Sequence, residues 1–278
     1  MVRLREMLDH AYSAGYAVPA FNVFDDMSMD AVLMSAARQR SPVVAQVSVR
    51  TASFWGPRVV QAGFAAKAHK YGATAILHLD HCREPDFLLA CLDSGWDSAL
   101  FDASYLSYSD SVLTTMRVVE LAGRRGADIE GEFEQITRVG ATVSANGPRP
   151  ATRIEDCVRF VESTGVSCFS PALGTQHGIH QVDPVIDYGR ARRLAQVAPV
   201  VLHGGSGLSD ACLHSVISSG VSKINFSSIL KERYSAVIRT SGRQSRSEPL
   251  ELIREIHGQL CELCRRYTEL MGSAGRAP

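Results

Sequence analysis

The sequence predicts a (β/α)8 barrel, and three observations support this fold class. Short apolar runs rich in β-forming residues alternate with amphipathic helical stretches, and the alternation repeats eight times. It occupies about 240 residues, close to the roughly 250 that this fold uses. The first run continues as Phe-Asn-Val-Phe-Asp-Asp (21–26), without the glycine-rich turn of a doubly wound dinucleotide-binding sheet. The barrel is therefore favoured over that competing architecture.

The expected elements follow one another in order along the chain. The predicted strands are Ala17–Val23, Pro42–Val47, Thr74–Leu79, Asp97–Phe101, Asp128–Phe133, Val166–Phe169, Val200–Leu202 and Ser222–Phe226. The helical stretches between them include Met27–Arg40, Arg58–Tyr71, Ser109–Arg125, Ile154–Thr164 and Leu208–Ser218.

Two segments fall outside the alternation. Thr137–Pro150 is a polar segment with glycine and proline that reads as a mobile lid after the fifth strand. Residues 241–249 read as a second loop, and it leads into a helix at about Leu250–Met271 that packs outside the barrel or against a partner subunit. We therefore expect a single domain over residues 1–278, with the barrel at about 1–240.

Composition excludes several classes of partner. The 29 basic residues balance the 29 acidic ones, so nothing attracts the chain to nucleic acid or to an anionic membrane. The sequence has no apolar run of the length that spans a bilayer and no signal peptide pattern. The seven cysteines have no disulfide-framework spacing, which favours a reducing cytoplasm, and Cys261 and Cys264 read as two helix residues one turn apart.

Polar residues occur at or just after the C-terminal end of every predicted strand. In a barrel these ends meet at one rim, where the chemistry of the fold is found. The rim residues are Asn22, Ser48, Asp80, His81, Asp102, Glu132, His177, His203 and Asn225.

Three of the rim residues are histidines. His81, His177 and His203 follow the third, sixth and seventh strands, and three neutral imidazoles are typical of a catalytic Zn²⁺ site with an open fourth position. Glu132 is placed to fill that position when substrate is absent. A histidine taken alone is more often structural, which is what we expect of the helical residues His10, His69, His214 and His257.

Asp80 is adjacent to one of these ligands, so we interpret it as the acid/base, with the orientation of a neighbouring side chain as its alternative role. His78 lies one strand period earlier and points to the same side. We expect it behind the site.

A phosphate site is predicted beside the metal. Gly204, Gly205, Ser206 and Gly207 follow the seventh strand as a cradle of backbone amides, and Asn225-Phe226-Ser227-Ser228 opens a helix after the eighth. Loops seven and eight are the common phosphate site of this architecture. A metal and a phosphate site on one rim indicate chemistry on a phosphorylated ketose, in which the metal polarises a carbonyl and a carboxylate moves protons.

The chain resembles the class II, zinc-dependent ketose-phosphate aldolases, which include the fructose- and tagatose-bisphosphate aldolases. The resemblance covers the chain to about residue 240. Its motifs are Val18-Pro-Ala-Phe-Asn-Val23, His78-Leu-Asp-His81, Ser98-Ala-Leu-Phe-Asp102, Ile129-Glu-Gly-Glu-Phe133, Gly174-Thr-Gln-His-Gly178, Val201-Leu-His-Gly-Gly-Ser-Gly207 and Lys223-Ile-Asn-Phe-Ser-Ser228.

The resemblance implies a role for each matching position. Asp80 matches the proton donor, His81, His177 and His203 match the zinc ligands, and Glu132 matches the carboxylate that exchanges onto the metal. Gly178, Gly204, Gly205, Ser206 and residues 225–228 match the site for dihydroxyacetone phosphate. Gly178 and Gly204 also match backbone ligands of a monovalent cation, Na⁺ or K⁺, found in some members. A homodimer or homotetramer is implied as well.

Two departures from the family pattern both affect the aldehyde half of the substrate. The family's loop after the fifth strand usually has an acidic segment, whereas Arg138–Asn146 contains no acid. The family's arginine in Asp-Pro-Arg, which reaches a distal phosphate, is replaced in Glu248-Pro249-Leu250. Arg50, Arg58, Arg138 and Arg149 are candidate replacements.

Three functional hypotheses follow. The leading one is a zinc aldolase that reversibly cleaves a ketose 1-phosphate into dihydroxyacetone phosphate and an aldehyde that need not be glyceraldehyde 3-phosphate. The second is a fructose- or tagatose-bisphosphate aldolase with a relocated acid and arginine. The third is a barrel that binds zinc and a sugar phosphate without turnover.

Overall fold

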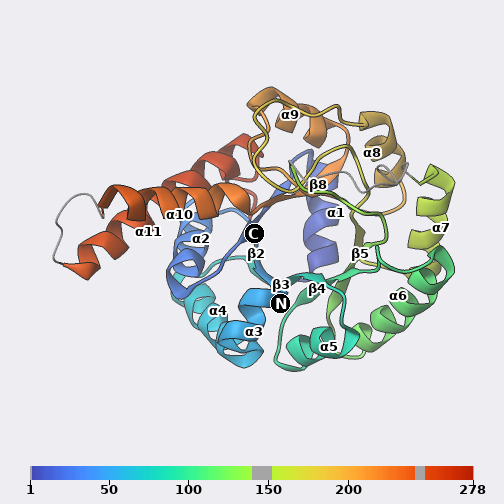
Figure 1. Ribbon diagram of the computed structural model, residues 1–278, viewed down its shortest axis with the longest axis horizontal. Helices are drawn as coiled ribbons and strands as arrows, with labels where there is room; N and C mark the ends of the chain where they lie inside the picture. The colour runs from blue at the N-terminus through green and yellow to red at the C-terminus, as the bar shows by residue number, and fades with distance from the viewer. Residues whose placement is uncertain (1, 140–151, 242–247, 278) are drawn as a thin grey trace.

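Eight parallel strands pair in chain order and close into a barrel in the computed structural model, which describes residues 2–139, 152–241 and 248–277 (Figure 1). The (β/α)8 prediction is therefore confirmed, and each observed strand overlaps its predicted run. The strands are β1 (Val18–Asn22), β2 (Val43–Ser48), β3 (Ala75–Cys82), β4 (Ser98–Asp102), β5 (Asp128–Glu132), β6 (Cys168–Phe169), β7 (Val200–Leu202) and β8 (Val221–Phe226).

Helices surround the barrel and connect its strands (Figure 1). The described helices are α1 (Leu4–Ala14), α2 (Asp26–Arg38), α3 (Val49–Trp55), α4 (Pro57–Tyr71), α5 (Pro85–Asp93), α6 (Tyr108–Gly123), α7 (Ile154–Thr164), α8 (Tyr188–Ala195), α9 (Asp210–Ser218), α10 (Ser228–Ser241) and α11 (Pro249–Leu270). Sequence patterning did not indicate α1 or the short α3. No helix in the described ranges is long and apolar enough to cross a membrane.

Helix α1 closes the end of the barrel opposite the rim, as its place behind the strands in Figure 1 shows. Leu4 and Leu8 on α1 are fully buried and belong to one apolar cluster with the barrel residues Val44, Ile76 and Val201. The helix is anchored by an ion pair between Arg3 and Asp128, 2.6 Å apart, at the start of β5. The bottom of the barrel is thus filled with side chains.

Helix α11 lies outside the barrel against α2 and α10, which is one of the two placements that the sequence left open (Figure 1). Tyr267 packs on Phe226 with ring centroids 4.2 Å apart. Cys261 and Cys264 lie one helical turn apart on α11, as predicted, and all seven cysteines are free thiols.

Candidate active site

The predicted rim residues surround a cavity of about 690 Å³ at the C-terminal end of the barrel. Its size falls in the ordinary range for a small-molecule site. The predicted site residues in its wall are Asn22, Ser48, Asp80, His81, Asp102, Glu132, His177, Gly178, Gly204, Ser206, Asn225, Ser227 and Ser228. His203 lies just beneath them and is 1% exposed.

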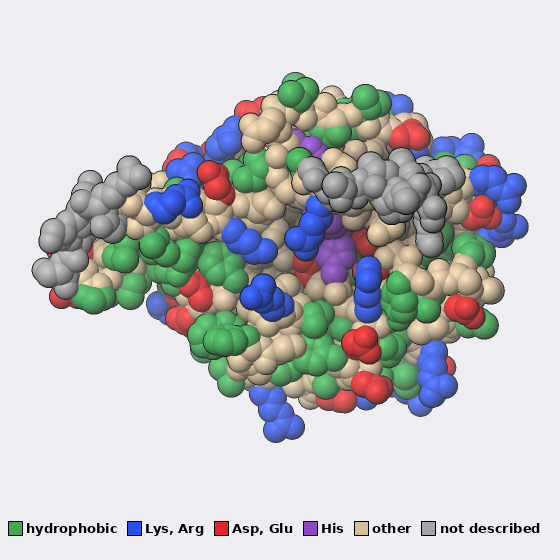
Figure 2. Space-filling model, in the orientation of Figure 1, with side chains coloured by type: hydrophobic (Ala, Val, Ile, Leu, Met, Phe, Trp, Pro, Cys, Tyr) green, Lys and Arg blue, Asp and Glu red, His purple; other side chains and the backbone are tan. Residues whose placement is uncertain are grey.

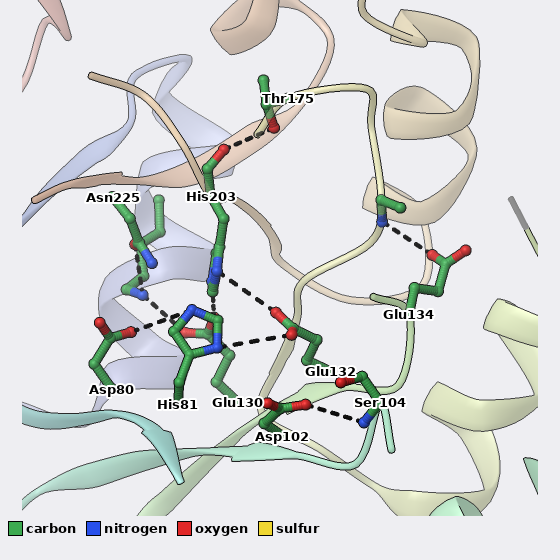
Figure 3. Close-up of polar contacts among 12 residues, drawn as sticks. Asp80, His81, Asp102, Ser104, Glu130, Glu132, Glu134, Thr175, His203 and Asn225 are labelled. Carbon is green, nitrogen blue, oxygen red and sulfur yellow. Dashed lines mark hydrogen bonds and ion pairs between the residues drawn. The ribbon is translucent and has the colours of Figure 1, made fainter. Parts of the chain in front are cut away.

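The three rim histidines converge on one point. Each of His81, His177 and His203 offers a ring nitrogen, and these atoms lie within 4.8 Å of one another. The ring centroid of His81 is 4.9 Å from that of His177 and 4.6 Å from that of His203. Figure 3 shows His81 between the carboxylates of Asp80 and Glu132. The described residues thus bring together a three-histidine ligand set from β3, the segment after β6 and the end of β7.

A local irregularity in β3 lets two consecutive residues face the same cavity. Side chains of a regular strand alternate between its faces, so Asp80 and His81 would point to opposite sides. The pairing of β3 with β4 shifts by one residue between Leu79 and Cys82, and His81 has φ of 51°. A non-glycine residue in this left-handed region costs roughly 1–3 kcal/mol. That strain places Asp80 beside a histidine that could hold a metal ion.

His177 lies eight positions after the end of β6 and is held by residues 137–139 of the segment that follows β5. Its N–H donates to the Thr137 carbonyl over 2.8 Å, and its carbonyl accepts from Val139 N–H over 2.9 Å. Only residues 137–139 of the expected lid segment are described, and residues 140–150 lie outside the described ranges. The described part of that segment therefore supports a histidine ligand.

Three buried atoms in this group have no hydrogen-bond partner among the described residues: Asp80 Oδ1, Glu132 Oε2 and His203 Nδ1. Burial and the negative charges of Asp102 and Glu130 raise the pKa of Glu132 well above its usual range. Burial and the neighbouring His81 lower the pKa of His177 to about 4. A divalent cation among these atoms would partner the orphaned oxygens and the imidazole and stabilise the ionised carboxylate. The donor set fits Zn²⁺.

Glu132 belongs to a second group of ligands as well. It lies with His81 and Asp102 close enough for one ion to contact all three. Its Oε1 is 3.7 Å from His81 Nδ1, and its Oε2 is 3.5 Å from His203 Nδ1. Glu132 thus lies between two of the imidazoles, and its exchange onto a metal stays a prediction.

Asp80 is oriented by a chain of amides from β1 and β2. Asn22 Nδ2 donates to Asp80 Oδ2 over 2.7 Å, and Gln46 Nε2 donates to Asn22 Oδ1 over 3.2 Å. Burial raises the pKa of Asp80, but the imidazoles His81 and His203 and the bond from Asn22 together lower it to about 2. Sequence analysis did not single out Gln46, although its place on β2 one residue before the end of the apolar run was a usable signal.

The predicted phosphate loops meet at one side of the cavity. Gly204 has φ of 72°, and a Cβ there would lie 2.2 Å from the backbone oxygen of Gln176, so the loop requires glycine. Ser206 Oγ accepts from the backbone N–H of Ile229 over 3.3 Å, in the first turn of α10. The open N-terminus of α10, which begins at Ser228, faces the same wall.

Two predicted phosphate contacts do not line the cavity. Gly205 is buried, and its N–H donates to the Asn225 carbonyl over 3.0 Å. Phe226 is also fully buried and packs against Phe21 and Tyr267. Gly205 therefore fixes the loop and Phe226 belongs to the apolar core, because strand alternation turns its side chain away from Asn225.

Cationic side chains surround the histidines in the hollow seen in Figure 2. Arg50, Arg83, Arg138 and Lys231 line the cavity. The guanidinium of Arg83 already has partners within the protein, because its Nε donates to Asp102 over 2.7 Å and it lies over the ring of Tyr105.

Among the candidate replacement arginines, Arg50 and Arg138 thus reach the cavity, Arg58 does not, and Arg149 lies outside the described residues. Leu250 is at the start of α11 and is not in the wall.

Lys231 is a cavity residue that sequence analysis missed. Lys223, the lysine of the motif at the eighth strand, is fully buried beneath the rim. Lys231 follows Ser228 by three positions on α10, which turns both toward the same side. Burial and the nearby Arg138 lower its pKa, while Asp80 raises it. Helical spacing from the serine was the signal that pointed to it.

Comparison with known proteins gives one consistent match. A family model described as fructose-bisphosphate aldolase class-II matches residues 2–276. The structure resembles the YdjI aldolase from Escherichia coli K12, with a TM-score of 0.86 and 24% identity over 100% of this chain and 99% of that one. It also resembles fructose-bisphosphate aldolase from Campylobacter jejuni, with a TM-score of 0.83 and 20% identity over 98% of this chain and 96% of that one.

Proposed function

The chain belongs to the class II fructose-bisphosphate aldolase family and is therefore a lyase, and on this premise we propose that it is a zinc-dependent aldolase acting on a ketose 1-phosphate. The products of cleavage are dihydroxyacetone phosphate and an aldehyde that need not be glyceraldehyde 3-phosphate. The observation that carries the proposal is the convergence of His81, His177 and His203 beside Asp80. Bound zinc supplies Lewis-acid polarisation of the ketose carbonyl.

Asp80 has the geometry and charge of the base in the cleavage direction. Its pKa of about 2 keeps it ionised at neutral pH, and Oδ1 has no partner among the described residues while Asn22 holds Oδ2. Asp80 takes the proton of the C4 hydroxyl as the C3–C4 bond breaks. The bonding pair moves toward the C2 carbonyl and forms an enediolate, whose protonation at C3 gives dihydroxyacetone phosphate. In condensation the same carboxyl returns its proton to the aldehyde oxygen.

The phosphate of the donor half fits the wall formed by Gly204, Ser206, Ser228 and Lys231. Backbone amides and the N-terminus of α10 favour a dianion, and the lysine adds a charge-assisted contact. Lys231 has no ion-pair partner in the described part of the chain, which supports a role in binding an anion.

A second candidate function has its own supporting observation. Arg50 follows Ser48 by two positions and lines the cavity, and no carboxylate of the described residues pairs with it. A guanidinium there would contact a distal phosphate, which favours a fructose- or tagatose-bisphosphate aldolase with a relocated arginine. The leading proposal is kept because two family features of the aldehyde half of the site are missing. The family arginine is absent, and the described residues of the loop after β5 place no acid in that part of the cavity.

Two observations bear on the cellular compartment and on the oligomeric state of the protein. Seven free thiols agree with the cytoplasm as its compartment. Exposed apolar side chains on α10 and α11, such as Ile238 and Ile253, agree with a homodimer or homotetramer.

The deciding experiment is a panel of aldehydes in the condensation direction with dihydroxyacetone phosphate, with and without a chelator. We expect product that depends on zinc and a preference for one class of aldehyde. The wild type and Arg50→Gln should then be compared on fructose 1,6-bisphosphate, because a selective loss on that substrate would favour the second candidate. Absence of any condensation by zinc-loaded protein would favour the barrel without turnover.

A further inference from the structure

A cluster of ionisable side chains lies buried in the barrel directly beneath the histidine site. Glu130 on β5 and Lys223 on β8 are fully buried and paired, with Lys223 Nζ 2.8 Å from Glu130 Oε2. His78 is also fully buried, as expected of a residue behind the site, and its Nδ1 lies 2.9 Å from Ser98 Oγ. The acid/base and phosphate contacts proposed above do not use these residues.

Glu130 contacts the metal-site histidine that lies deepest in the barrel. Its Oε1 is 2.9 Å from His203 Nε2 (Figure 3). A carboxylate oxygen only accepts, so Nε2 carries the ring proton and donates it to Glu130. The other ring nitrogen, Nδ1, is then a free lone pair, and it has no hydrogen-bond partner among the described residues. The contact therefore selects both the tautomer and the ring orientation, in which Nδ1 lies 3.5 Å from Glu132 Oε2.

Lys223 connects the same carboxylate to the wall of the cavity. Its Nζ donates to Glu130 Oε2 and also to Asn225 Oδ1, 2.9 Å away. The ammonium group thus offsets the charge of Glu130 in the apolar interior and keeps its second oxygen away from His203.

Stability alone is a weak reason for such a pair, because buried ion pairs are often no more stabilising than apolar residues of the same volume. A carboxylate that orients a ligand histidine is a common feature of zinc sites. The contacts of Glu130 with His203 and Lys223 fit that second reason.

We propose that Glu130 is a positioning residue that holds His203 as an Nδ1 ligand for zinc, and that Lys223 holds Glu130 in place for this task. The inference rests on the proposed function, since it takes His203 to be a zinc ligand.

The test uses the double variant Glu130→Gln, Lys223→Met, which removes both charges and leaves neither one buried alone. Zn²⁺ affinity is measured by competition with a chromogenic chelator, and folding is checked by circular dichroism. The matched control is Asp128→Asn, which also removes a buried carboxylate of β5 from an ion pair, here with the half-exposed Arg3 at the end far from the rim. We expect the double variant to bind Zn²⁺ 10- to 100-fold more weakly than the wild type, with the control unchanged.

Each outcome decides the matter. Wild-type affinity in the folded double variant, or an equal loss in the control, would overturn the inference. If the double variant does not fold, the ring tautomer of His203 in the zinc-loaded wild type is read from ¹H–¹⁵N NMR, and a proton on Nδ1 would overturn it. Wild-type protein that binds no zinc would instead contradict the proposed function.

Discussion

Asn22 Nδ2 donates a hydrogen bond to Asp80 Oδ2 over 2.7 Å, which orients the carboxylate and leaves the buried Oδ1 as the oxygen without a hydrogen-bond partner among the described residues. Asp80 is thus oriented by a neutral amide from another strand. No Lys or Arg of the described residues pairs with it, and His81 Nε2 is 3.8 Å from Oδ1.

The first prediction concerns this carboxylate. Asp80→Ala should retain zinc and lower kcat by about 10²- to 10⁴-fold, the usual contribution of a positioned acid/base. Metal content by atomic absorption and kcat for cleavage are measured together, with Asp110→Ala on the exposed face of α6 as control. A kcat within a few-fold of the wild type would show that another group moves the proton.

Metal removal is the second prediction. Chelation should abolish cleavage, and added Zn²⁺ or Co²⁺ should restore it, because three imidazoles without an ion cannot polarise a carbonyl. His203→Ala should lose both the metal and the activity.

Full activity in metal-free protein would rule out the zinc mechanism. Borohydride trapping would then test for a Schiff base, and Lys231 in the cavity wall is the residue to examine first.

The third prediction concerns the donor phosphate. Lys231→Met should mainly raise the KM for dihydroxyacetone phosphate, since a charge-assisted hydrogen bond contributes about 1.5–3 kcal/mol, or roughly 10- to 150-fold in affinity. Ser228→Ala should act in the same direction. Steady-state kinetics in the condensation direction measure both, with Lys70→Met on α4 as the matched control far from the cavity. A fall in kcat at unchanged KM would contradict a binding role.

The fourth prediction concerns the distal end of the substrate. Fructose 1,6-bisphosphate should be a poor substrate compared with a ketose 1-phosphate that carries a less charged tail, because a second phosphate lacks the bidentate arginine of the family. The comparison is of kcat/KM for the two substrates. A value for the bisphosphate at or above about 10⁴ M⁻¹s⁻¹, which is ordinary for an enzyme on its own substrate, would contradict this prediction and show that another group replaces the missing arginine.

The fifth prediction concerns pH and the metal-free protein. Burial lowers the pKa of His177 to about 4 and that of His78 to about 3, whereas unfolded histidines titrate near 6.5. Between these values the unfolded chain binds more protons, so the free energy of unfolding should fall as the pH drops below about 6.5.

Each such histidine contributes a slope of about 1.4 kcal/mol per pH unit, and above pH 7 this contribution should be flat. Urea denaturation from pH 5 to 8 measures it. His177→Gln should have a shallower slope than the wild type, and equal slopes would contradict the assignment.

The barrel and most of the site could be predicted because they depend on regular geometry. Eight alternating elements fix which strand ends meet, so Asp80, Glu132 and His203 could be assigned to one rim before their distances were known. Details that depend on irregular backbone could not be predicted. Two examples are the left-handed φ of His81 and the backbone hydrogen bonds between His177 and residues 137–139. Both depend on tertiary contacts, which local sequence patterns do not predict.

The side chain of Phe226 does not line the cavity, for a related reason. Motif matching assigns a whole segment to a ligand, whereas strand alternation presents only every second side chain to it. The motif that matches the family ends at Ser228 and so did not indicate Lys231. The cavity wall continues along α10 to Lys231.

Helix α1, sealed into the barrel floor by Leu4 and Leu8, has a consequence for the order of events in turnover. The interior behind Glu130 and Lys223 is packed with side chains. In the described structure, reactants and products can therefore enter and leave only through the opening of the cavity at the rim. Two fragments from one bond cleavage must then leave in sequence through the same opening, the outer fragment ahead of the inner one. If the phosphate half binds on the loops after β7 and β8 as proposed, the aldehyde should depart first, and dihydroxyacetone phosphate should act as the competitive product inhibitor of cleavage.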